Sequence, residues 1–227
     1  MVPSYKDCVV EKPWGYEYLV FETEEVALWL LYIKKNEATS LHCHPNKTTG
    51  LIVVEGSVEI TFVNDKRVLN HFDKAMIRRG LFHSTKSLSE LGSYVLEIET
   101  PNDKADLVRL NDLYGRSNTG YEKNKSLSER GKEEIWISEP QGGPQIYQIG
   151  NQVFNVQHVN NFEFFEKLHD QDIVMFLRGG LGKTVDERRL LATMPGDVLK
   201  GNILKILSLE MEFIEKNSLV ALFENNK

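Results

Sequence analysis

The sequence has few cysteines, no long apolar run and no excess of positive charge. Its 227 residues include two cysteines, Cys8 and Cys43, too few and too far apart for the disulfide framework of a small secreted domain. The longest apolar run, Val26–Ile33, is far shorter than the roughly 20 residues that a membrane span needs, and the first residues lack the pattern of a secretion signal. We therefore expect a cytoplasmic protein without a membrane partner.

The charge balance is acidic, which bears on the choice of partner. Lys and Arg total 27 against 33 Asp and Glu, a net charge of −6. Such a chain has no general attraction to phosphate backbones, so nucleic acid is not an expected partner. The apolar fraction of 41% is enough for a sizeable core, in one large domain or in two smaller ones.

Short runs of β-branched and aromatic residues, separated by Gly, Asn, Asp or Pro, predict a mostly-β fold of the sandwich or barrel type. In one run Val58 and Ile60 alternate with Glu59, which predicts a strand with one buried face. The predicted strands are Tyr16–Phe21, Ala27–Lys34, Leu51–Val54, Ser57–Phe62, Ala75–Ile77, Tyr94–Ile98, Gln145–Ile149, Val153–Val156, Ile173–Leu177, Ile203–Leu209 and Leu219–Phe223. The apolar positions of 203–215 also fit an amphipathic helix.

A weak internal repeat indicates two β units. Gly56 comes seven positions after Thr49, and Gly179 comes seven positions after Asp172. Each pair is followed by a turn that contains Asp, at Phe72-Asp73 and at Gly196-Asp197. We expect a first unit over 1–116, a polar linker over 117–143 and a second, degenerate unit over 144–227.

Three histidines form the candidate metal site. His42 and His44 stand two apart after the segment Lys34–Leu41, so on a strand both face the same side, and His83 comes from a separate strand. Three inward imidazoles are a ligand set that Zn, Mn, Fe, Co or Ni accepts with positions left open for water or substrate. The second unit has apolar or small residues at the matching positions, so we expect no metal there.

This order of His42-x-His44, Gly56, Asp73, Gly80 and His83 resembles the two motifs of the cupin superfamily. The segments Glu11–Glu17 and Asp106–Arg116 resemble the two ends of the cupin domain of type II mannose-6-phosphate isomerases and mannose-1-phosphate guanylyltransferases. The resemblance covers about residues 11–116. It implies a double-stranded β-helix (jelly-roll) barrel, pairing into a homodimer and a metal-dependent sugar-phosphate chemistry. The Glu ligand of the superfamily pattern falls on Thr49.

Other charged residues near the histidines complete the candidate site. Glu97 and Glu99 are candidate catalytic bases, and either carboxylate is also a candidate for the ligand that position 49 lacks. The candidates for binding a phosphate or sugar nucleotide are Lys47, Arg78, Arg79 and Lys86.

Three functions stay open at this point. The first is a sugar or sugar-phosphate isomerase or epimerase, in surface-polysaccharide metabolism by resemblance. The second is an iron dioxygenase, which the three-histidine set favours. The third is a carbohydrate-binding or assembly module without catalysis, which the absence of Glu at position 49 favours.

Overall fold

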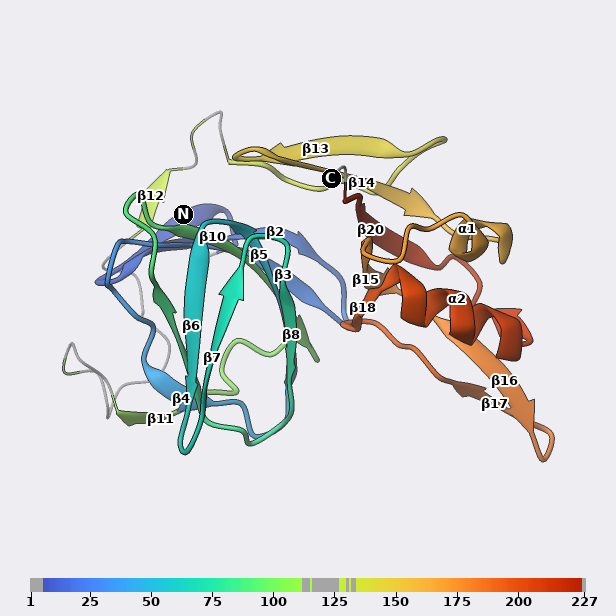
Figure 1. Ribbon diagram of the computed structural model, residues 1–227, viewed down its shortest axis with the longest axis horizontal. Helices are drawn as coiled ribbons and strands as arrows, with labels where there is room; N and C mark the ends of the chain where they lie inside the picture. The colour runs from blue at the N-terminus through green and yellow to red at the C-terminus, as the bar shows by residue number, and fades with distance from the viewer. Residues whose placement is uncertain (1–5, 112–114, 116–126, 130, 132–133, 226–227) are drawn as a thin grey trace. The chain divides into compact units, whose positions relative to one another are not determined.

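The computed structural model describes residues 6–111, 115, 127–129, 131 and 134–225. The chain divides into two compact units, unit 1 (Met1–Trp136) and unit 2 (Ile137–Lys227), each drawn in Figure 1. Of the predicted linker, residues 117–126, 130 and 132–133 lie outside the described residues, as do residues 112–114 and 116 of the segment that resembles the end of a cupin domain. Among the described residues, no helix has the length and apolar character to cross a membrane.

Unit 1 is built from two antiparallel sheets. Its strands are β1 (Cys8–Lys12), β2 (Gly15–Glu22), β3 (Ala27–Ile33), β4 (Leu41–Cys43), β5 (Thr48–Glu55), β6 (Ser57–Phe62), β7 (Lys66–Asn70), β8 (Lys74–Ile77), β9 (His83–Ser87), β10 (Ser93–Thr100), β11 (Val108–Asn111) and β12 (Leu127–Glu129). One sheet has the order β12-β1-β2-β3-β10-β5-β8, and the other has the order β11-β4-β9-β6-β7.

The strand order of unit 1 is that of a jelly roll. Strands β3, β10, β5 and β8 form one half and β4, β9, β6 and β7 the other, so from β3 to β10 the chain alternates between the two sheets except at the hairpin β6-β7 (Figure 1). An eight-stranded barrel of two Greek keys has this arrangement, which is the double-stranded β-helix of cupins. The mostly-β fold class predicted from the sequence is confirmed.

The core of unit 1 lies between its two sheets. Trp29, Val53 and Val95 of the first sheet pack in one apolar cluster with Val58 and Ile60 of the second. The alternation in β6 is therefore confirmed, because Val58 and Ile60 are buried and Glu59 between them is only partly so. Toward one end of the same interior the apolar side chains give way to polar ones, and there the candidate site lies.

Unit 2 repeats part of this topology. Its elements are β13 (Gln145–Ile149), β14 (Gln152–His158), α1 (Glu163–Glu166), β15 (Ile173–Arg178), β16 (Leu181–Val185), β17 (Arg188–Leu191), β18 (Val198–Lys200), α2 (Gly201–Glu210), β19 (Phe213–Ile214) and β20 (Leu219–Phe223). Its sheets have the orders β13-β14-β20-β15-β18 and β17-β16-β19. The run β14-β20-β15-β18 corresponds to β3-β10-β5-β8 of unit 1, which supports the predicted two-unit fold with a degenerate second copy.

One predicted strand of unit 2 is wrong. Ile203–Leu209 was expected to be a strand, but it lies within helix α2. The buried residues of α2, Gly201, Leu204 and Ser208, recur at spacings of three and four, which is the periodicity of a helix with one covered face. Leu204 packs there against Phe165 and Leu168. The helix stands between β18 and β19, where unit 1 has only the turn that leads from β8 to His83.

The same turn occurs in both units before the strands β8 and β18. In unit 1 the Asp73 side chain accepts a hydrogen bond from Asn70 N, and in unit 2 the Asp197 side chain accepts one from Met194 N, both at 2.9 Å. The residue before each Asp has a positive φ, 69° at Phe72 and 95° at Gly196. The repeat read from the sequence thus corresponds to one turn geometry used twice.

Candidate metal centre

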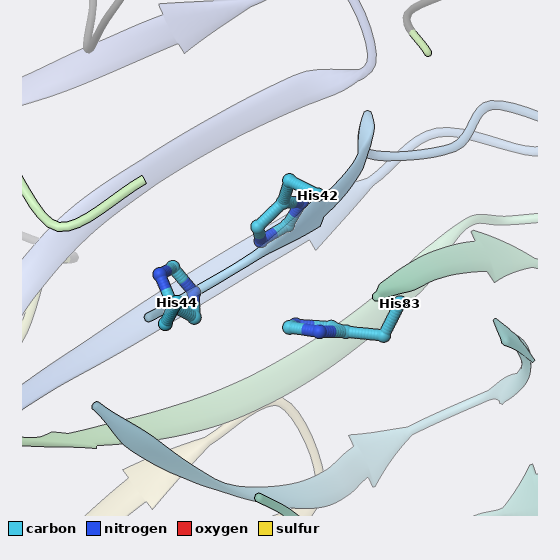
Figure 2. A group of neighbouring side chains, drawn as sticks. All are labelled: His42, His44 and His83. Carbon is cyan, nitrogen blue, oxygen red and sulfur yellow. The ribbon is translucent and has the colours of Figure 1, made fainter. Parts of the chain in front are cut away.

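The structure brings His42, His44 and His83 together. His42 lies on β4, His44 follows that strand directly, and His83 begins β9, where it pairs across the sheet with His42. One nitrogen from each ring lies within 4.8 Å of those of the other two, and the rings converge from the two neighbouring strands (Figure 2). Two strands that are distant in sequence therefore present three imidazoles to one point.

The outer nitrogen of each ring contacts a backbone carbonyl. Nδ1 of His42 lies 2.7 Å from Ser40 O, that of His44 lies 2.6 Å from Asp106 O, and that of His83 lies 3.0 Å from Leu81 O. A carbonyl only accepts, so each Nδ1 carries the proton and each Nε2 keeps its lone pair. This is the tautomer that a metal-binding histidine needs, and the contact also fixes the ring orientation.

The buried Nε2 atoms fit a metal ion. In the described part of the chain, Nε2 of His44 and Nε2 of His83 are buried without a hydrogen-bond partner. A buried acceptor without a partner costs about 1–3 kcal/mol, so two such atoms side by side indicate a missing electrophile. The three neutral nitrogens and the enclosed position suit a divalent transition metal.

The surroundings keep all three imidazoles neutral. Burial is the main cause, and it lowers the pKa of His83 to about 4. Burial, with the neighbouring His83 and His44, places the pKa of His42 well below its usual value. Burial and the charge of Lys47 lower the pKa of His44. The rings are therefore in the ligand form at neutral pH, and no proton has to leave before an ion binds.

Glu99 and Lys47 form a buried ion pair beside this cluster. Their side chains are only 3% and 1% exposed, and Lys47 Nζ donates to Glu99 Oε1 at 2.8 Å. The same carboxylate oxygen lies 3.8 Å from His44 Nε2. Burial alone would raise the pKa of Glu99, but Lys104 and Lys47 hold it below its usual value. Glu99 is thus an ionised carboxylate at the edge of the histidine cluster.

The histidines open into a pocket with charged walls. Its lining includes His42 and His44 with four basic and three acidic side chains, which are Lys12, Lys47, Lys104, Arg109, Glu17, Glu97 and Glu99. Basic groups outnumber acidic ones here by one although the whole chain is acidic, and Lys12, Lys47 and Lys104 lie in ion pairs with Glu17 or Glu99.

Glu97 shares this pocket and differs from Glu99 in its ionisation. Both project from β10 into the barrel, because residues two apart on a strand share a face. Burial and the negative charge of Glu99 raise the pKa of Glu97 to about 8. Two carboxyl groups in one pocket thus differ in protonation at neutral pH.

The predicted phosphate-binding residues are not all brought to this pocket. Lys47 lines it, whereas Arg78 and Arg79 line a separate depression with Thr48, Gly80 and Leu81. Lys86 lies opposite Glu59 in the pairing of β9 with β6, on the face of that sheet turned away from the core. The structure therefore groups Lys47, Glu97 and Glu99 with the histidines and places the other three elsewhere.

Sequence reasoning missed four charged residues of the pocket. Lys12 and Glu17 come from β1 and β2, and Lys104 and Arg109 from the chain that follows β10. Lys104 Nζ lies 3.1 Å from Glu17 and 3.6 Å from the centre of a Trp29 ring. Lys12 and Glu17 lie inside segment 11–17, so the resemblance there carried a signal that such residues belong to the site.

Comparisons with known proteins agree with this picture. No protein-family model matches the chain. Xanthan biosynthesis protein XanB of Xanthomonas campestris pv. campestris is 26% identical over 110 residues, which are 48% of this chain and 24% of that protein. Mannose-1-phosphate guanylyltransferase of Klebsiella pneumoniae is 24% identical over 109 residues, which are 47% and 23% of the two chains. The similarity thus spans about a quarter of the length of these relatives.

The solved structure of KdgF from Halomonas sp. is 21% identical, covers 40% of this chain and 83% of its own, and superposes with a TM-score of 0.39. The guanylyltransferase similarity confirms the resemblance found in the sequence, and the strand order shows the architecture. Unit 1 has a cupin fold. The cupin unit carries the histidine cluster, and unit 2 has no such cluster among its described residues.

Proposed function

We propose that the cupin unit holds a divalent transition metal through His42, His44 and His83 and acts on a sugar or sugar phosphate as an isomerase or epimerase. The observation that carries the proposal is the convergence of three Nε2 atoms whose rings are already oriented by backbone carbonyls. Zn, Mn, Fe, Co and Ni all fit a set of imidazole ligands.

The residues around the cluster support the choice of substrate. Lys47, Lys104 and Arg109 favour an anion in the pocket, and a sugar phosphate is both anionic and rich in hydroxyl groups. When bound, the metal supplies polarisation of a substrate carbonyl or hydroxyl oxygen. Glu97 lines the same pocket and is our candidate for moving a proton between neighbouring carbons. Arg78, Arg79 and Lys86 are weaker candidates for the phosphate, because the structure places them outside this pocket.

The names of the relatives support the setting. Mannose-1-phosphate guanylyltransferase and a xanthan biosynthesis protein both point to activated sugars and polysaccharides. We therefore propose a role in surface-polysaccharide metabolism, carried out in the cytoplasm. We also propose a homodimer, which sedimentation equilibrium of the full chain tests.

Metal analysis of the purified chain tests the proposed function. Elemental analysis is expected to find about one Mn, Zn, Co or Ni per chain after reconstitution, and none in the His42→Ala/His83→Ala variant. The control is His71→Ala/His158→Ala, which removes two imidazoles outside the cluster and should keep the metal. The loaded protein is then assayed with aldose and ketose phosphates.

The other outcomes discriminate among functions. Stoichiometric iron would favour dioxygenase chemistry at the same three histidines. Metal with sugar-phosphate binding but no turnover would contradict the enzyme proposal and favour a carbohydrate-binding module. No metal in any protein after reconstitution would refute the metal site.

A further inference from the structure

Glu99 is buried beside three neutral imidazoles and has an unused oxygen. Its residue is 2% exposed, and its Oε1 is engaged by Lys47. Its Oε2 is buried and has no hydrogen-bond partner among the described residues. A carboxyl oxygen that is buried without a partner is costly in the interior, so this position of Oε2 calls for a further partner.

The position of Glu99 is set by the pairing of β10 with β5. In the register of this pair Glu99 stands directly opposite Thr49, whose Oγ1 is also buried without a partner in the described part of the chain. Opposite residues of an antiparallel pair share a face, with Cβ atoms about 4.5–5.5 Å apart. The Glu99 carboxylate, on β10, therefore lies in the same part of the barrel as a carboxylate would if position 49, on β5, were Glu.

We propose that Glu99 is the fourth protein ligand of the metal held by His42, His44 and His83, so that β10 supplies the carboxylate that β5 lacks. The inference rests on the proposed metal site. It assigns different roles to the two glutamates of β10: Glu99 binds the ion, and Glu97 is left for proton transfer. It also gives a partner to three atoms that are buried without one among the described residues, which are Glu99 Oε2, His44 Nε2 and His83 Nε2.

Cobalt titration of single variants tests the assignment. Co²⁺ is added to the metal-free full chain in competition with a chelator, and its visible absorption reports the ligand set. Glu99→Gln should weaken Co²⁺ binding at least about tenfold and change the absorption spectrum, since even groups behind the ligands are worth about 10–100-fold. Glu97→Gln is the matched control, two residues along the same face, and should weaken binding less than about threefold without changing the band shape.

A second variant separates the loss of a ligand from a general disturbance of the site by the Glu99→Gln substitution. Glu99→Gln/Thr49→Glu moves the carboxylate across the strand pair and should recover most of the lost affinity. Circular dichroism of each variant without metal checks that it is folded. Two results would overturn this inference but leave the metal site intact. One is an equal loss of Co²⁺ affinity in Glu99→Gln and Glu97→Gln, and the other is a Co²⁺ affinity of Glu99→Gln equal to that of the wild type. No Co²⁺ binding by the wild type would overturn both.

Discussion

At the scale of single residues, Asp106 fixes part of the histidine cluster through its backbone carbonyl and its carboxylate. Its backbone carbonyl accepts from His44 Nδ1 at 2.6 Å. Its carboxylate accepts from the backbone N–H of Asn46, the side-chain amide of Asn46 and the backbone N–H of Lys47, each at 2.9 Å. One residue therefore orients a ring of the cluster and also fixes the turn that leads to Lys47.

Removal of this carboxylate should destabilise unit 1. Asp106→Ala leaves the buried N–H of Lys47 without an acceptor, which costs about 1–3 kcal/mol of unfolding free energy. Urea unfolding measures the change. Asp103→Ala is the control from the same loop, where the side chain is exposed and caps only Ala105 N, and it should cost less than about 0.5 kcal/mol. Equal losses in the two variants would contradict the role given to Asp106.

The residues of the site differ in how far the sequence could predict them. The pairing of His42 with His44 was predictable, because a spacing of two on a strand is a local rule. The contact between Lys47 and Glu99 was not, because these residues are 52 positions apart and meet only through the register of β5 with β10. The same reason hid Lys104 and Arg109, which reach the pocket from the chain beyond β10.

At the scale of elements, the turn shared by the two units requires a positive φ at one position, which is Phe in unit 1 and Gly in unit 2. Phe72 and Gly196 occupy the same position and both have positive φ. In each unit the backbone N–H of this residue donates to the strand that pairs with the one after the turn, to Val53 O of β5 in unit 1 and to Phe176 O of β15 in unit 2. The geometry is therefore preserved although a bulky residue replaces glycine in unit 1.

Substitutions at these two positions should have unequal effects. Gly196→Ala should destabilise unit 2 by about 1–2 kcal/mol, the cost of a left-handed conformation for an L-residue. Phe72→Gly should change the stability of unit 1 by less than about 1 kcal/mol, because relief of that strain offsets lost packing and the greater freedom of the unfolded chain. Thermal unfolding of both variants measures this. A neutral Gly196→Ala would show that the turn tolerates the conformation without strain.

Strands and helices whose apolar residues recur with one clear period could be predicted from the sequence. Segments whose apolar residues fit both the strand and the helix period could not. The alternation of Val58, Glu59 and Ile60 occurs in the structure as a strand with one covered face. Residues 203–209 carry apolar side chains at spacings that fit either period, and the packing of Leu204 against Phe165 and Leu168 selects the helix. Tertiary contacts of this kind cannot be read from the segment itself.

At the scale of the whole molecule, the two units share part of a topology, but among the described residues only unit 1 has a cluster of side chains that could bind a metal ion. Unit 1 presents His83 at the start of β9, whereas the corresponding part of unit 2 contains α2 followed by the two-residue strand β19. Among the residues described in unit 2, no cluster of metal-binding side chains occurs. Any stabilisation by a bound ion therefore originates in unit 1.

Hydrogen exchange should report this difference. Zn²⁺ at a free concentration about 100 times its Kd stabilises the species that binds it by about 2.7 kcal/mol. Peptides that contain β4, β9 and β10 are expected to gain protection, and peptides from β15 and β20 are expected to change little. The His42→Ala/His83→Ala variant is the control and should show no gain. Equal protection in both units would contradict a site confined to unit 1.

The ion pair of Lys47 with Glu99 has a consequence for how the protein is assembled. A buried carboxylate is tolerated only when a positive group accompanies it, and here the chain supplies that group itself. Zinc fingers and many small metallo-domains, by contrast, fold only together with their metal. This barrel can reach its fold first and acquire the ion afterwards. Binding of the proposed ion would then stabilise a unit that is already folded, so metal supply would set the fraction loaded and add to stability without being required for folding.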